Sequence, residues 1–118
     1  MERRTDGTLD LRRTKASLAL EALGRDAPIE TNALGAKQSR TETAFDCLDG
    51  KAMLALGNVL FLGKEKYGKD NWRNIPTDDH LNHAMMHIFA HLAGDKQDVH
   101  LEHAFCRLMF AVAMELQD

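Results

Sequence analysis

All six histidines of the chain lie within residues 80–103, in the stretch HLNHAMMHIFAHLAGDKQDVHLEH. His83 and His87 are spaced i, i+4, which places them on one face of a helix. Imidazoles at this spacing, with Asp95 and Asp98 nearby, are a ligand set typical of a divalent metal. The stretch therefore indicates a metal or phosphate site. The alternative is a set of ordinary polar histidines on a helical hairpin.

A second stretch, GKEKYGKDNWR at residues 63–73, combines three lysines and an arginine with a tyrosine and a tryptophan. Cations beside aromatic rings can hold phosphates and stack a base. The alternative is a helix C-terminus whose lysines complement the helix dipole and whose tryptophan fills the core. The candidate substrate-binding residues are Lys64, Lys66, Tyr67, Asn71, Trp72 and Arg73.

Three segments with a helical period of apolar residues must position these side chains. Short turns join them, and no segment alternates apolar and polar residues over a useful length. The fold class is therefore all-α, a small helical bundle built on an antiparallel helical hairpin. The expected helices span 50–66, with Asp49 as cap and Gly68 as stop, then from a cap at Thr77 or Asp78 to Gly94, then 96–116.

The helical period also predicts which side chains face the core and which face the site. On the second helix, four histidines share one stripe that flanks the apolar face. That stripe consists of His80, His83, His87 and His91. The side chains expected in the core include Leu56, Val59 and Leu62, then Ala84, Phe89 and Leu92, then Ala104, Phe105 and Val112.

The N-terminal part of the chain is weakly patterned. Residues 1–44 are predicted to form an arm with one short helix near residues 15–23, and residues 29–43 to be an extended arm or loop. Residues 45–118 form the predicted helical domain.

Composition narrows the class of protein. A chain of 118 residues, 44% of them hydrophobic, is enough for one compact domain. The formal charge of −3 argues against a general nucleic-acid binder. No apolar run reaches the ~18 residues that a membrane span needs. With no export signal, Cys47 and Cys106 are expected to be reduced thiols in a cytoplasmic protein.

Several separate blocks of the sequence resemble a family found mostly in tailed phages, named for the N-terminal domain of dATP/dGTP diphosphohydrolase. The resemblance covers about residues 45–115. Val99 departs from the family pattern, in which an acid precedes the next histidine, so a metal site here would be weakened or the ligand role reassigned to Asp98. The matching residues are Lys66, Tyr67, Gly68, Asn71 and Trp72, then His83 and His87, then Gly94 and Asp95, then Asp98, His100, Leu101, His103 and Ala104.

This resemblance implies metal-dependent hydrolysis of a purine deoxynucleoside triphosphate to the monophosphate and pyrophosphate. Asp98 and His87 would then be catalytic, and the divalent ion would be Mg, Mn, Co or Zn. The ligands implied for that ion are His83, His87, Asp95, Asp98, His100 and His103.

Other classes of function fit the same sequence. The chain could be a non-catalytic phage protein that sequesters a nucleotide or inhibits a host protein, or it could hold a purely structural metal. Stoichiometric bound metal would favour a site, and turnover would separate the catalytic from the structural case. Long amphipathic helices in so small a domain also predict a homo-oligomer.

Overall fold

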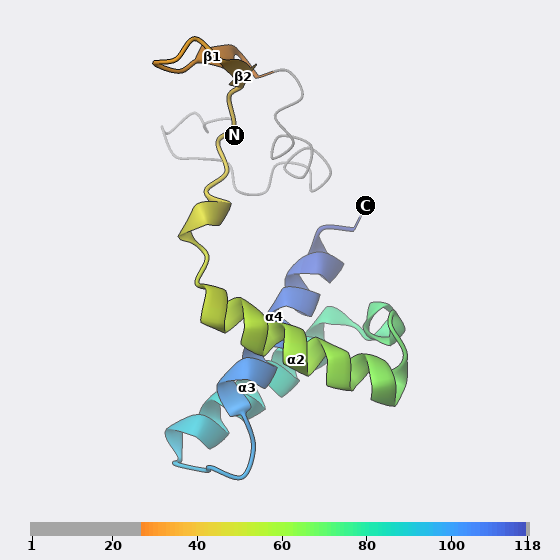
Figure 1. Cartoon of the computed structure of the whole chain (residues 1–118). Coiled ribbons are helices and arrows are strands. Elements are labelled where there is room, and N and C mark those ends of the chain that lie inside the picture. Colours follow the sequence, from red (N-terminus) through yellow and green to blue (C-terminus); the bar gives the residue numbers. More distant parts are fainter. Residues whose placement is uncertain (1–26, 118) are drawn as a thin grey trace, which may run out of the picture. The chain divides into compact units, whose positions relative to one another are not determined.

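The computed structural model describes residues 27–117, and its chain divides into two compact units. The first unit contains the residues up to Asp46, and the second runs from Cys47 to Leu116 (Figure 1). The short helix predicted at residues 15–23 lies outside the described residues.

The first unit contains a two-stranded antiparallel sheet, where the sequence predicted only an extended arm or loop. Strands β1 (Ile29–Thr31) and β2 (Lys37–Ser39) pair with Glu30 opposite Gln38. In the turn between them, the Asn32 side chain accepts hydrogen bonds from the backbone N–H groups of Leu34 and Ala36, both at 3.0 Å. Every residue of both strands is exposed, so no apolar alternation marks them. Local turn chemistry therefore forms this hairpin.

The second unit is helical, as predicted, and its three α-helices lie close to the expected positions. None of the described helices is both long and apolar enough to cross a membrane. Figure 1 shows α3 and α4 running antiparallel, with α2 lying across the pair. The elements of this unit are α2 (Gly50–Tyr67), the 3₁₀ turn η2 (Asn71–Asn74), α3 (Thr77–Leu92) and α4 (His100–Glu115). The 3₁₀ turn η1 (Phe45–Cys47) lies at the sequence boundary between the two units.

The ends of α2 confirm the predicted cap and stop. The carboxylate of Asp49 accepts a hydrogen bond of 2.8 Å from the Ala52 N–H, which satisfies a free donor of the first turn. Gly68 ends the helix with φ 93° and ψ 151°, backbone angles that side-chain-bearing residues rarely adopt. This glycine turns the chain into η2, which carries Trp72.

The starts of α3 and α4 differ from the prediction. Thr77 is the first residue of α3, and Pro76, with extended backbone angles, precedes it in place of a side-chain cap. Helix α4 begins at His100 instead of residue 96. The carboxylate of Asp98 accepts a hydrogen bond from the Val99 N–H at 2.8 Å. Such local bonding competes with helical bonding, so the connection extends up to residue 99.

The core is small, and alanines form much of it. Ala84 on α3 and Ala104 and Ala111 on α4 are at most 4% exposed, and such small side chains let packed helices approach closely. Helix α2 adds Leu56 and Val59, which form a cluster with Cys106. Both cysteines are free, and burial raises the pKa of the Cys106 thiol. Other predicted core residues are exposed: Leu62 by 63%, Phe89 by 65%, Leu92 by 72%, Phe105 by 37% and Val112 by 58%.

Candidate functional site

The α3–α4 connection brings three of the predicted metal ligands together. The Nδ1 atoms of His87 and His100 lie 2.9 Å apart. One ligand atom from each of these histidines and one Asp98 carboxylate oxygen all lie within 4.8 Å of one another. His87 comes from α3, whereas Asp98 and His100 come from the connection and the start of α4. The hairpin therefore assembles a ligand group from residues on both sides of its turn.

One acid and one histidine outside this group, Asp95 and His103, contact its members. Nε2 of His100 donates to Asp95 Oδ2 at 2.5 Å. Because Nε2 donates to Asp95, Nδ1 is the ring nitrogen of His100 that faces His87. Nε2 of His103 lies 3.3 Å from Asp98 Oδ1, and its ring stacks on that of His87 with centroids 4.9 Å apart. Asp95 and His103 thus surround the group as supports.

The charges around the cluster favour a neutral His87 beside an ionised Asp98. Burial, followed by the charges of His103 and His100, lowers the pKa of His87. The hydrogen bond from the Val99 N–H, with smaller contributions from the histidines, lowers the pKa of Asp98. A neutral imidazole and a carboxylate are the protonation states that bind a divalent cation.

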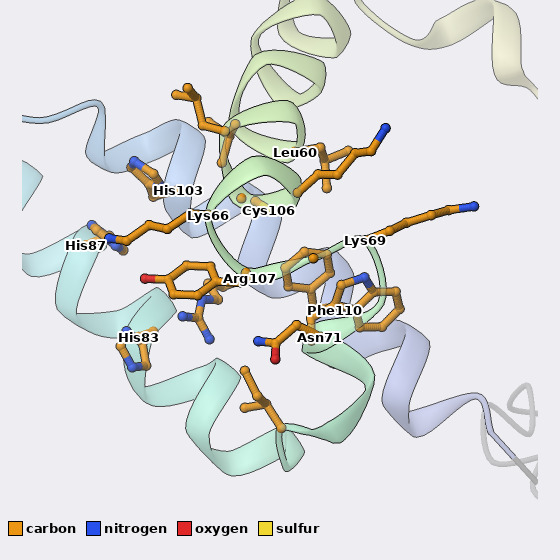
Figure 2. Close-up of a pocket in the computed structure, with 18 of the residues that line it drawn as sticks. Leu60, Lys66, Lys69, Asn71, His83, His87, His103, Cys106, Arg107 and Phe110 are labelled. Atoms are coloured by element: carbon orange, nitrogen blue, oxygen red, sulfur yellow. The ribbon is translucent and has the colours of Figure 1, made fainter.

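A pocket with a volume of about 700 Å³ adjoins this cluster, lined by residues of α2, η2, α3 and α4. Four cationic side chains line it: Lys64, Lys66, Lys69 and Arg107. Asp98 is the single acid among the lining residues. The pocket is therefore cationic although the whole chain has a formal charge of −3. Figure 2 shows Lys66 extending toward the histidines, whereas Lys69 extends away from them.

The aromatic residues of the pocket occupy different environments. Trp72 stacks on Phe110 with ring centroids 4.5 Å apart and an interplanar angle of 6°. The Arg73 guanidinium lies over the Trp72 ring, 4.3 Å from the ring centroid. The Trp72 ring thus already contacts two side chains of the protein. Tyr67 is 59% exposed and lines the pocket, with the Lys66 ammonium 5.1 Å from its ring centroid.

The predicted site residues separate into two groups. Asp98, His83, His87 and His103 line the pocket together with Lys64, Lys66, Tyr67, Asn71 and Trp72. Arg73 does not line it and pairs instead with Asp70 at 3.1 Å. Asp95 and His100 lie beside the pocket, joined to it through His87. His83 lies outside the three-residue ligand group.

Two polar residues that sequence reasoning did not assign to the site belong to its framework. His80, expected on the same stripe as His87, has no exposed area. It bonds the Trp72 carbonyl through Nε2 at 3.0 Å and Arg107 through Nδ1 at 3.1 Å. Arg107 follows His103 by four residues and so lies on the histidine face of α4. This spacing is the feature of the sequence that could have indicated its place in the site.

Comparison with known proteins identifies the family. A family model described as dATP/dGTP diphosphohydrolase, N-terminal, matches residues 32–118. The matched region contains the histidine cluster, the cationic pocket and helices α2, α3 and α4. No curated protein and no solved structure matches the chain. Because the match spans well over half of the sequence, the chain belongs to the dATP/dGTP diphosphohydrolase N-terminal domain family.

Proposed function

We propose that this protein is a metal-dependent nucleotide hydrolase that converts purine deoxynucleoside triphosphates to the monophosphate and pyrophosphate. One observation carries the proposal: the ligand group of His87, Asp98 and His100 lies beside a pocket with four cationic side chains. A divalent ion and positive side chains are what a triphosphate needs for charge neutralisation. The family description supplies the purine deoxynucleotide.

The chemistry of the donor set fits a divalent transition metal. Two imidazoles and a carboxylate suit Zn, Mn or Co better than Mg, which prefers oxygen ligands. The Asp95–His100 hydrogen bond is the outer contact that orients a ligating histidine and raises its basicity. The two facing Nδ1 atoms of His87 and His100 also need a hydrogen or a cation between them. A bound metal would polarise a phosphate and favour deprotonation of water.

In this proposal, the acid–base role falls to Asp98. Water attacks the α-phosphorus, the bond from that phosphorus to the bridging oxygen breaks, and pyrophosphate leaves. Asp98 takes the proton from the attacking water, and His103, 3.3 Å away, stabilises the carboxylate before transfer. The neutral ring of His87 would hold the metal at the pocket edge, since burial lowers the pKa of this histidine.

Binding of the nucleotide falls to the α2 end of the pocket. Lys64 and Lys66 neutralise phosphate charge there. Tyr67 provides an exposed ring for stacking on the base. Trp72, whose ring contacts Phe110 and Arg73, instead positions Asn71 and the rest of η2 at the pocket wall.

The test is turnover of each deoxynucleoside triphosphate with Mg²⁺, Mn²⁺, Co²⁺ or Zn²⁺, with the products resolved by chromatography. We expect monophosphate and pyrophosphate from dATP or dGTP, and none after metal chelation. His87→Ala should reduce kcat at least 100-fold, because it removes a ligand on which the chemistry depends. His91→Ala is the matched control, since His91 is exposed and does not line the pocket. Intact triphosphates with every metal would overturn the proposal and favour a nucleotide-sequestering or host-binding protein.

We also propose that the protein forms a homo-oligomer. Many large apolar side chains of α3 and α4 are exposed, including Phe89 at 65% and Leu92 at 72%. Exposed apolar faces of this kind mark interaction surfaces.

A further inference from the structure

A partly buried chain of hydrogen bonds holds Arg107 at the pocket. The Trp72 carbonyl can only accept, so Nε2 of His80 carries the hydrogen of their 3.0 Å bond. Nδ1 of His80 therefore presents a lone pair, and the Arg107 guanidinium donates to it at 3.1 Å. Since His80 has no exposed area, its ring cannot reorient freely. His80, itself bonded to the Trp72 carbonyl of η2, thus fixes the position of the Arg107 guanidinium.

The charge of Arg107 lacks an acidic partner among residues 27–117. The contacting atom of His80 is a neutral nitrogen, and no carboxylate in the described part of the chain pairs with the guanidinium. Arg107 is half-buried, so solvent compensates its charge only in part. Its remaining N–H donors have the fork geometry that binds phosphate oxygens in pairs.

Arg107 also lies at the right place along α4. His100, His103 and Arg107 are spaced i, i+3 and i+7, so they share one helix face. At 1.5 Å per residue, Arg107 stands about 6 Å beyond His103 along the axis. Figure 2 shows Arg107 between the histidines and Asn71. A phosphate chain that begins at the metal ligands and continues toward η2 must pass it.

We propose that Arg107 is a phosphate-binding residue of this pocket and that His80 is the residue that positions it. The inference rests on the proposed function for its physiological ligand, a nucleoside triphosphate. Whatever the physiological ligand, the pocket binds a triphosphate chain through Arg107 even without metal.

The first test measures binding of inorganic triphosphate to the metal-free protein by calorimetry in the presence of a chelator. Arg107→Ala should weaken binding at least tenfold, because it removes charge-assisted hydrogen bonds. Arg107→Lys should give an intermediate affinity, since it keeps the charge and loses the fork. Lys51→Ala, which removes an exposed cation of α2 outside the pocket, should change the affinity less than twofold. Equal affinity of Arg107→Ala and the unmodified protein would overturn the assignment.

The second test separates positioning from simple structural support. His80→Gln keeps one donor and one acceptor and should retain most of the affinity, whereas His80→Leu should lose it. In the Arg107→Ala background, His80→Leu should weaken triphosphate binding no further, because His80 acts through Arg107. An additional loss in that background would contradict the positioning role. Circular dichroism checks that each variant is folded.

The two proposals fail in different ways. Turnover of a deoxynucleoside triphosphate that is unaffected in KM and kcat by Arg107→Ala would remove the inference and leave the proposed function intact. If triphosphate binding depended on Arg107 but no metal supported turnover, the proposed function would be overturned and the assignment of Arg107 would remain. Absence of both binding and turnover would overturn both.

Discussion

At the residue scale, Asp95 contacts the candidate metal-binding group through one of its histidines. Its carboxylate accepts from Nε2 of His100, whose other ring nitrogen faces His87. Among the described residues, the group of convergent ligand atoms contains His87, Asp98 and His100 and not Asp95. The geometry thus favours a role through His100, whereas the family resemblance alone implied a direct ligand.

This arrangement predicts the effect of removing Asp95. Asp95→Ala should lower the affinity for Zn²⁺ or Co²⁺ about 10- to 100-fold, because outer hydrogen-bond partners of ligating histidines contribute that much. Titration calorimetry measures the affinity. Asp79→Ala removes an equal charge from an exposed position on α3 and should leave metal binding unchanged. If both variants bound metal like the unmodified protein, Asp95 would have no part in the site.

At the element scale, the turn that ends α2 leads directly into η2, and both elements line the pocket. Gly68 has φ 93° and ψ 151°, and the next residues form η2 with Trp72 stacked on Phe110. The turn therefore joins the lysine-bearing end of α2 to the aromatic part of the pocket. A residue with a Cβ would be strained at this φ, although no atom lies within 4 Å of the Cβ position.

Two glycine substitutions on α2 should act in opposite directions. Gly68→Ala should lower the free energy of unfolding by about 1–3 kcal/mol, because the backbone conformation is strained for alanine. Gly57 lies within the helix, is exposed and has open space at its Cβ position. Gly57→Ala should therefore raise the free energy of unfolding by about 0.5–1 kcal/mol. Urea denaturation followed by circular dichroism measures both. A neutral Gly68→Ala would show that the turn is not constrained.

At the scale of the whole molecule, the α3–α4 hairpin has two unlike faces. Helical rotation of 100° per residue places the site residues on one face and a stripe of large apolar residues on the other. All members of the stripe are 37–72% exposed. The stripe is about as long as the two 16-residue helices, roughly 24 Å. It consists of Leu81, Met85, Phe89 and Leu92 on α3 and Leu101, Phe105, Leu108 and Val112 on α4.

A second copy of the chain is the partner that we expect on this apolar stripe. Two hairpins facing each other across a two-fold axis would form a four-helix bundle and bury about 800 Å² per copy. Light scattering after gel filtration should give twice the chain mass, and Phe89→Asp should give the monomer mass. Phe61→Asp is the matched control, because Phe61 is exposed on α2, outside the stripe. A monomer at micromolar concentration would contradict the dimer.

Local chemistry in the sequence was sufficient to predict the three helices, the Asp49 cap, the Gly68 stop and the histidine cluster. These features depend on side chains and backbone within a few residues of one another, so spacing reveals them. The β-hairpin also depends on local bonds to Asn32, yet its strands carry no apolar alternation to predict it.

Tertiary packing alone decided which polar residues belong to the core and which to the site. His80 and His87 share one stripe of α3, yet His80 is sealed against η2 and α4 while His87 faces His100 and the pocket. Periodicity gives the direction of a side chain, whereas its burial and partners depend on which element covers that direction. For the same reason, the contact of Arg107 with His80 and the exposure of Phe89 depend on how α2, α3 and α4 pack together.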